Sequence, residues 1–180
     1  MPKTRLQNKG YTQVYTGSGK GKTTAALGLA FRAMGWGMKT YIGQFMKGQK
    51  YGELDAARMV AAYIVIEQYG LNTFVHVQNP PDAEHVAMAK SGYEKIQTAL
   101  FSKKYDIVVA DEILTSNYFN LLSTHELLNL IEEKPNSVEL ILTGRYAPQE
   151  IVEAADLVSE IKEIKHYYHL GVETRKGIER

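Results

Sequence analysis

The sequence contains no cysteine, and this absence excludes several kinds of chemistry at once. Without thiols the chain cannot form a disulfide scaffold, bind zinc or an iron–sulfur cluster through sulfur, or use a cysteine nucleophile. Its five histidines are scattered without the helical spacing of a metal site, and no G-x-S-x-G nucleophile motif occurs. We therefore do not expect a hydrolase built on a catalytic triad, and an enzyme of this sequence must use the reactivity of a bound cosubstrate.

Long hydrophobic runs and a strong net charge are also lacking. No apolar run approaches the roughly 18 residues that a membrane span needs, and the basic start of the chain is not followed by the apolar core of a signal peptide. The formal net charge of +1 gives no overall attraction for nucleic acid or membrane surfaces. The 180 residues show no repeat or linker. We expect one cytoplasmic domain over residues 1–180, without nucleic-acid or membrane partners.

Strand-like runs alternate with helical patterns along the chain. The expected strands are rich in Val, Ile and Leu without polar alternation, as in strands buried on both faces, and they cover residues 11–15, 40–45, 107–110 and 138–143. The helical patterns cover residues 22–34, 53–66, 82–101 and 123–133, with Asp82 expected to cap the third and a Ser123 to Glu126 capping box opening the fourth. A further strand is expected at residues 72–77, and residues 157–164 fit either a final strand or part of a helix. This order predicts a three-layer α/β fold with a mostly parallel central sheet and helices on both faces.

A glycine-rich loop follows the first expected strand, where residues 16–24 read TGSGKGKTT. Its glycines let backbone N–H groups turn inward, Lys22 supplies a cation, and Thr23 can place a hydroxyl on Mg²⁺. The match to G-x-x-x-x-G-K-[ST] is incomplete, because Thr16 stands where the first glycine belongs, or else Gly17 begins the motif one residue late. An ordinary strand-to-helix turn is the alternative. The expected nucleotide-binding residues of this loop are Gly17, Ser18, Gly19, Lys20, Gly21, Lys22, Thr23 and Thr24.

Two carboxylates follow an apolar strand about 90 residues beyond the loop, in the sequence YDIVVADE at residues 105–112. Because parallel strands end at the same edge of a sheet, Asp111 or Glu112 can face Thr23 across a Mg²⁺-triphosphate. The candidate metal ligands are therefore Thr23, Asp111 and Glu112, and the sequence does not choose between the two carboxylates. Together with the glycine-rich loop they predict a P-loop NTPase-like (RecA-like) fold.

Three further loops should leave the same edge of the sheet. Residues 44–48, which include Gln44 and Lys47, could bring an ammonium group near the nucleotide or form a solvated loop. Arg145 ends the block LTGR at residues 142–145 and is well placed to bind phosphate or carboxylate. The polar and aromatic residues 165–173 form either a cover for the site or plain surface.

The order and spacing of several sequence blocks make the chain resemble the ATP:corrinoid adenosyltransferases. The resemblance is carried by residues 17–26, 44–48, 111–113, 142–145, 154–158 and the pairs 165–166 and 171–172. The shortened loop is itself the variant found in that family. The resemblance implies transfer of the 5′-deoxyadenosyl group from Mg-ATP to the cobalt(I) of a reduced corrinoid such as cob(I)alamin, with release of tripolyphosphate, in adenosylcobalamin synthesis or salvage. It also implies a homodimer and a reductase that delivers the cobalt(I) state.

The implied reaction agrees with the residues that are present. Cobalt(I) is a nucleophile that carries no proton, so its attack on C5′ of ATP needs no general base. The protein must instead align the reactants and stabilise charge on the departing triphosphate, which is work for N–H groups, Lys20, Lys22 and Mg²⁺. On this basis Lys22, Thr23 and Glu112 are the expected catalytic residues.

The corrinoid contacts are expected in the loop at Gln44 and Lys47 and in the segment at residues 73–79. Relatives use aromatic residues in the latter segment to crowd the lower face of the corrin, and Phe74 is the candidate here, with burial in the core as the alternative. Two other functions are weighed against adenosyl transfer. One is a phosphoryl-transferring ATPase or kinase on the same architecture, and the other is a noncatalytic nucleotide or corrinoid carrier.

Overall fold

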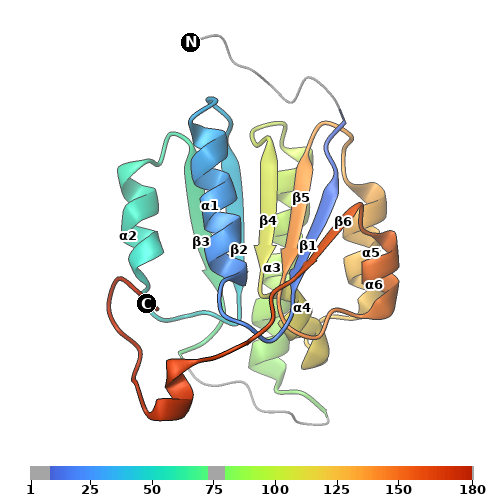
Figure 1. Cartoon of the computed structure of the whole chain (residues 1–180). Helices are drawn as coiled ribbons and strands as arrows, with labels where there is room; N and C mark the ends of the chain where they lie inside the picture. Colours follow the sequence, from blue (N-terminus) through green and yellow to red (C-terminus); the bar gives the residue numbers. More distant parts are fainter. Residues whose placement is uncertain (1–8, 73–79, 180) are drawn as a thin grey trace.

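The computed structural model describes residues 9–72 and 80–179 and contains a six-stranded sheet. The strands lie in the order β3-β2-β4-β5-β1-β6, and every recorded pairing is parallel. Their bounds are β1 Thr12–Thr16, β2 Thr40–Phe45, β3 Ile64–Tyr69, β4 Ile107–Asp111, β5 Glu139–Thr143 and β6 Leu157–Glu160. The carboxyl ends of all six strands therefore share one edge of the sheet (Figure 1). The predicted parallel α/β fold is confirmed.

Helices cover both faces of the sheet, as Figure 1 shows. Their bounds are α1 Lys22–Met34, α2 Gly52–Met59, α3 Ala83–Phe101, α4 Ile113–Tyr118, α5 Thr124–Glu133 and α6 Gln149–Ala154, and a 3₁₀ turn η1 covers Tyr167–Leu170. Strand β4 shows how the layers form, because its side chains alternate. Val108 and Ala110 join the apolar cluster that contains α3 and α5, whereas Ile107 and Val109 join the cluster under α1. Such two-sided burial explains why this strand has no polar alternation.

The helix predicted at residues 53–66 is wrong in its second half. Helix α2 ends at Met59, the chain turns, and Ile64–Tyr69 forms strand β3, paired in register with β2. The apolar stretch at residues 59–66 fits a helix face and a strand equally well, and its β-branched residues then favour the strand. The strand expected at residues 72–77 falls almost wholly outside the described residues. Residues 157–160 form a strand, which settles the other open alternative.

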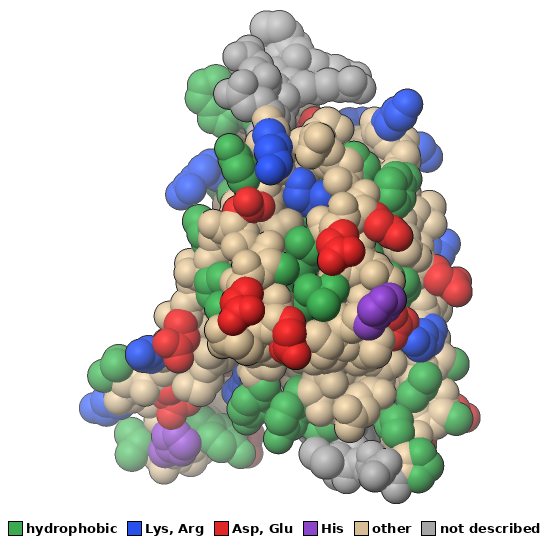
Figure 2. Space-filling model, turned by 90° about the vertical axis from the view of Figure 1, so that its right-hand side faces the viewer, with side chains coloured by type: hydrophobic (Ala, Val, Ile, Leu, Met, Phe, Trp, Pro, Cys, Tyr) green, Lys and Arg blue, Asp and Glu red, His purple; other side chains and the backbone are tan. Residues whose placement is uncertain are grey.

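In the view of Figure 1, the chain after β6 runs along the carboxyl edge of the sheet and its end lies just below α2. No helix in the described part of the chain combines the length and the apolar character that a bilayer span requires. Figure 2 shows the face that carries α5 and α6, with acidic side chains over its middle and Lys and Arg at its margins.

Candidate active site

The glycine-rich loop packs directly against the chain that follows β6. Gly19 donates its N–H to the carbonyl of Ile161 at 2.8 Å, just beyond the end of β6. A Cβ on Gly17 would stand 2.4 Å from the same carbonyl oxygen, and Gly17 has a φ of 103°. Glycine is therefore required at this position both for space and for backbone conformation. The loop with the shortened motif thus makes a close contact with the residue that follows β6, the strand beside β1.

Lys22 is buried at the start of α1 and folds back over the loop. Its Nζ donates to the carbonyl of Gly17 at 2.7 Å and to that of Gly19 at 2.9 Å, and the residue is 5% exposed. Burial lowers the pKa of Lys22, and the positive charge of Arg145 acts in the same direction, while Glu112 and Asp111 oppose them. The ammonium thus lies within the loop that the sequence assigns to a triphosphate, where its hydrogen bonds go to the neutral carbonyl groups of Gly17 and Gly19.

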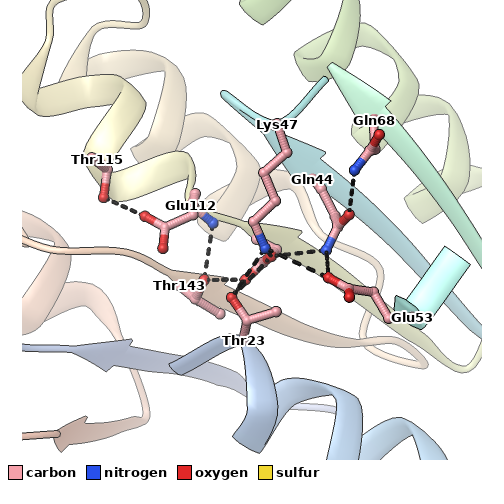
Figure 3. Close-up of polar contacts among 9 residues, drawn as sticks. Thr23, Gln44, Lys47, Glu53, Gln68, Glu112, Thr115 and Thr143 are labelled. Carbon is pink, nitrogen blue, oxygen red and sulfur yellow. Dashed lines mark hydrogen bonds and ion pairs between the residues drawn. The ribbon is translucent and has the colours of Figure 1, made fainter. Parts of the chain in front are cut away.

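Asp111 is the centre of a polar cluster at the end of β4. It is fully buried, and its Oδ1 accepts hydrogen bonds from Thr23 Oγ1 at 2.9 Å and Thr143 Oγ1 at 2.7 Å. Its Oδ2 accepts from Lys47 Nζ at 2.8 Å and from Gln44 Nε2 at 3.3 Å. Figure 3 shows these four partners arriving from α1, β2, β5 and the loop after β2. The predicted meeting of Thr23 with a carboxylate of β4 is present in the structure.

Glu112 points elsewhere, although it is the next residue. Its backbone is left-handed, with a φ of 62°, and its N–H donates to Thr143 Oγ1 at 2.9 Å. Its carboxylate accepts from Thr115 Oγ1 at 2.6 Å, in the first turn of α4. The left-handed turn thus separates the two carboxylates, and Asp111 is the one bonded to Thr23.

Lys47 and Gln44 lie inside the cluster. The Lys47 side chain is 15% exposed and stands 3.9 Å from Glu53, so the solvated-loop alternative does not hold for it. Burial lowers the pKa of Lys47, but the ion pair and hydrogen bond with Asp111, together with Glu53 and Glu112, outweigh it and raise the pKa overall. Gln44 is fully buried, donates to Glu53 at 3.0 Å and accepts from Gln68 at 3.1 Å.

The remaining predicted residues lie around this cluster or outside the described chain. Ser18, Lys20, Thr24 and Arg145 are exposed. The N–H of Arg145 donates to Thr115 Oγ1 at 2.9 Å, which fixes the backbone of the loop after β5 against α4. Phe74 falls outside the described residues, and the turn at Tyr167–Leu170 has no buried residue.

Sequence reasoning missed three members of the cluster, Thr143, Glu53 and Gln68. Thr143 ends β5, the strand next to β4, so its position at a strand end beside Asp111 was the available signal. Glu53 lies in the first turn of α2, and Gln68 lies in β3, whose residues 64–66 fell within the predicted helix, so neither could be placed without the register of β3 on β2.

The described residues contain no group of three or more His, Asp or Glu side chains arranged to hold a metal ion by themselves. Mg²⁺ bound with a nucleotide usually takes one or two protein oxygens and completes its shell with phosphates and water. A single buried carboxylate beside a threonine hydroxyl at a helix N-terminus is such a partial set. With the glycine-rich loop and the parallel sheet, these features define a P-loop nucleotide-binding protein of the α/β class.

Comparison with known proteins gives the particular family. Residues 8–180 match the family model described as ATP:corrinoid adenosyltransferase BtuR/CobO/CobP. The chain is 33% identical over 180 residues to a corrinoid adenosyltransferase of Sinorhizobium sp, covering 98% of this chain and 83% of that protein. It is 32% identical to the corrinoid adenosyltransferase of Escherichia coli (strain K12), covering 95% and 86%. It is 30% identical to the corrinoid adenosyltransferase CobA of Salmonella typhimurium, covering 96% and 87%. The chain belongs to the ATP:corrinoid adenosyltransferase family.

Proposed function

We propose that the protein transfers the 5′-deoxyadenosyl group of ATP to the cobalt(I) of a reduced corrinoid, and that the triphosphate leaves whole. The observation that carries this proposal is a triphosphate-type loop beside which the two carboxylates at the end of β4, Asp111 and Glu112, both accept hydrogen bonds from other side chains. Asp111 accepts hydrogen bonds from four side chains, and Glu112 accepts one from Thr115. A kinase needs a base for its acceptor hydroxyl. Cobalt(I) carries no proton, so adenosyl transfer needs none.

The cationic groups fit a departing triphosphate. Within the described part of the chain the Lys22 ammonium donates to two loop carbonyls, so phosphate oxygens would replace neutral acceptors with charged ones. Lys20 and Arg145 are exposed beside the loop and can add charge as negative charge grows on the leaving group. In this account Lys22 is the principal residue that stabilises the triphosphate.

The contacts of Thr23 and Asp111 support Mg²⁺ as the metal that accompanies ATP. The side-chain oxygens of Thr23 and Asp111 already contact a cation, because Lys47 Nζ lies 3.3 Å from Thr23 Oγ1 and 2.8 Å from Asp111 Oδ2. The donors are hydroxyl and carboxylate oxygens, which are the ligands that Mg²⁺ prefers. Thr23 and Asp111 would hold the ion directly, with Glu112 one residue away. Bound there, Mg²⁺ would neutralise triphosphate charge.

Several further expectations stay predictions drawn from the resemblance. They are a homodimer, a reductase as electron donor, a cytoplasmic location, a role in adenosylcobalamin synthesis or salvage, and corrinoid contacts by Phe74, Gln44 and Lys47. For Gln44 and Lys47 the contacts with Asp111 support a role on the nucleotide side of the site.

The proposal is tested by incubating the protein with Mg-ATP and chemically reduced cob(I)alamin. The expected product is a corrinoid whose spectrum reverts on illumination, because the cobalt–carbon bond is photolabile. Formation of ADP and phosphate instead would support the phosphoryl-transfer alternative. Binding of both substrates without any product would support the carrier alternative.

A further inference from the structure

Lys47 supplies a positive charge to the cluster around Asp111. Its ammonium makes an ion pair with a carboxylate whose side chain is 1% exposed, and it also contacts the hydroxyl of Thr23. Both contacts are to the two oxygens that, under the proposed function, would hold Mg²⁺. Figure 3 shows the Lys47 side chain coming from the loop after β2 and pointing toward Thr23. The chain's own cation therefore occupies the place of the metal.

The ammonium and a divalent ion cannot use this place together. Mg²⁺ binds oxygen ligands at about 2.0–2.1 Å and demands an octahedral shell. An ammonium 2.8 Å from the same carboxylate oxygen fills part of that shell and adds repulsion between like charges. Entry of the metal thus requires Lys47 to leave Asp111.

The structure also offers Lys47 a second position. Glu53, at the start of α2, lies 3.9 Å from Lys47 Nζ with a side chain that is 17% exposed, and the ring of Tyr51 lies 5.4 Å from the same nitrogen. A carboxylate and an aromatic face are both favourable partners for an ammonium. Lys47 can therefore leave Asp111 and keep a charged partner after a small rotation of its own side chain.

We propose that Lys47 is a built-in counter-ion that holds the metal position until Mg²⁺ arrives with ATP and displaces it toward Glu53. Without a partner, the buried carboxylate of Asp111 would be an uncompensated charge. The exchange makes metal binding competitive with Lys47, so this residue sets how strongly ATP binding depends on Mg²⁺. This inference rests on the proposed function, because it takes Thr23 and Asp111 as the metal site.

The test compares ATP affinity with and without Mg²⁺ by calorimetry, in the absence of corrinoid so that no reaction occurs. The wild-type protein is compared with Lys47→Met and with Lys50→Met as the control. Lys50 belongs to the same loop, but its side chain is 75% exposed and pairs with Asp55 at 3.0 Å. The quantity compared is the ATP dissociation constant without Mg²⁺ divided by that with Mg²⁺. If Lys47 occupies the metal position about nine-tenths of the time, Lys47→Met should raise this ratio about ten-fold. Lys50→Met should leave the ratio within about two-fold, because its charge is solvated.

The possible outcomes distinguish a failure of the role proposed for Lys47 from a failure of the proposed function. A ratio unchanged by Lys47→Met would mean that Lys47 and Mg²⁺ act side by side, and it would overturn the role proposed for Lys47 alone. Failure of the wild-type protein to bind ATP with Mg²⁺ would overturn the metal site and the proposed function together.

A second measurement needs only the wild-type protein, in case Lys47→Met does not fold. The rate at which acetic anhydride labels the Lys47 amine is followed by mass spectrometry in the ATP complex. Adding Mg²⁺ should increase that rate several-fold, while labelling of Lys50 stays constant. An equal or slower rate for Lys47 with Mg²⁺ bound would overturn the displacement.

Discussion

The buried ion pair between Asp111 and Lys47 makes a prediction that stability measurements can check without any ligand. Asp111→Asn leaves the Lys47 ammonium with only the more distant carboxylate of Glu53, 3.9 Å away, and Lys47→Met leaves the buried carboxylate with three hydrogen-bond donors and no cation. Removing one member of a buried pair costs about 3–5 kcal/mol. We therefore expect each single variant to lose about 3 kcal/mol of unfolding free energy.

The double variant should lose much less than the sum, because it leaves neither charge unpaired. Independent effects would give a loss of about 6 kcal/mol, whereas a coupling of about 2 kcal/mol, within the usual range for residues in contact, gives about 4 kcal/mol. Urea unfolding in the presence of EDTA and without nucleotide measures all four proteins. The exposed pair Lys50–Asp55 is the control cycle, and its coupling should stay below about 1 kcal/mol.

The result that would refute this reasoning is additivity at the buried pair. If the losses of the two single variants add within about 0.5 kcal/mol, the two charges do not depend on one another in the folded protein. The account of Lys47 as the counter-ion of Asp111 would then fail at its first step.

Three further predictions concern the loop, a buried tyrosine and a helix cap. Gly17→Ala should weaken ATP binding at least ten-fold by calorimetry, because its Cβ would stand 2.4 Å from the Ile161 carbonyl oxygen. The control is Gly37→Ala, which is also at positive φ but in open space and should leave ATP binding unchanged. Burial and then hydrogen bonds with Tyr69 and Glu67 raise the pKa of Tyr41 above its ordinary value of 10.0. The unfolded chain therefore loses this proton first, so the stability that Tyr41 contributes is complete below about pH 10 and is lost as the pH rises above it. In urea unfolding, the unfolding free energy of Tyr41→Phe should fall less steeply above about pH 10 than that of the wild-type protein. An equal fall in both proteins would exclude this cause. Ser123→Ala should cost about 1 kcal/mol in the same assay with no change in ATP affinity, since Ser123 caps α5 away from the site; an unchanged stability would contradict the capping box.

The elements that depend on local signals could be predicted from the sequence. Helix α1 begins and ends where its pattern indicates, Asp82 caps α3, and the capping box opens α5. Strand β3 could not be predicted, because its apolar residues continue a pattern that also fits α2.

The site shows a similar division. The motif placed Thr23 and a carboxylate of β4 together across 88 positions of sequence, because parallel strands end at one edge. It did not tell Asp111 from Glu112, since the left-handed backbone at Glu112 directs the second carboxylate toward α4. It also did not place Lys47 on Asp111, because the direction of a side chain in a loop depends on contacts that no motif encodes.

The central claim is that the triphosphate of ATP leaves intact while C5′ is transferred to cobalt, with Lys22 stabilising the leaving group. The most direct measurement uses ATP labelled with ¹³C at C5′, reduced cob(I)alamin and Mg²⁺, followed by ¹³C and ³¹P NMR, with Lys22→Ala as the matched variant. We predict a ¹³C signal of a cobalt-bound methylene and the ³¹P signals of tripolyphosphate for the wild-type protein, and neither for the folded Lys22→Ala protein. Signals of ADP and phosphate with C5′ still bonded to oxygen, or near-normal turnover by Lys22→Ala, would contradict the account.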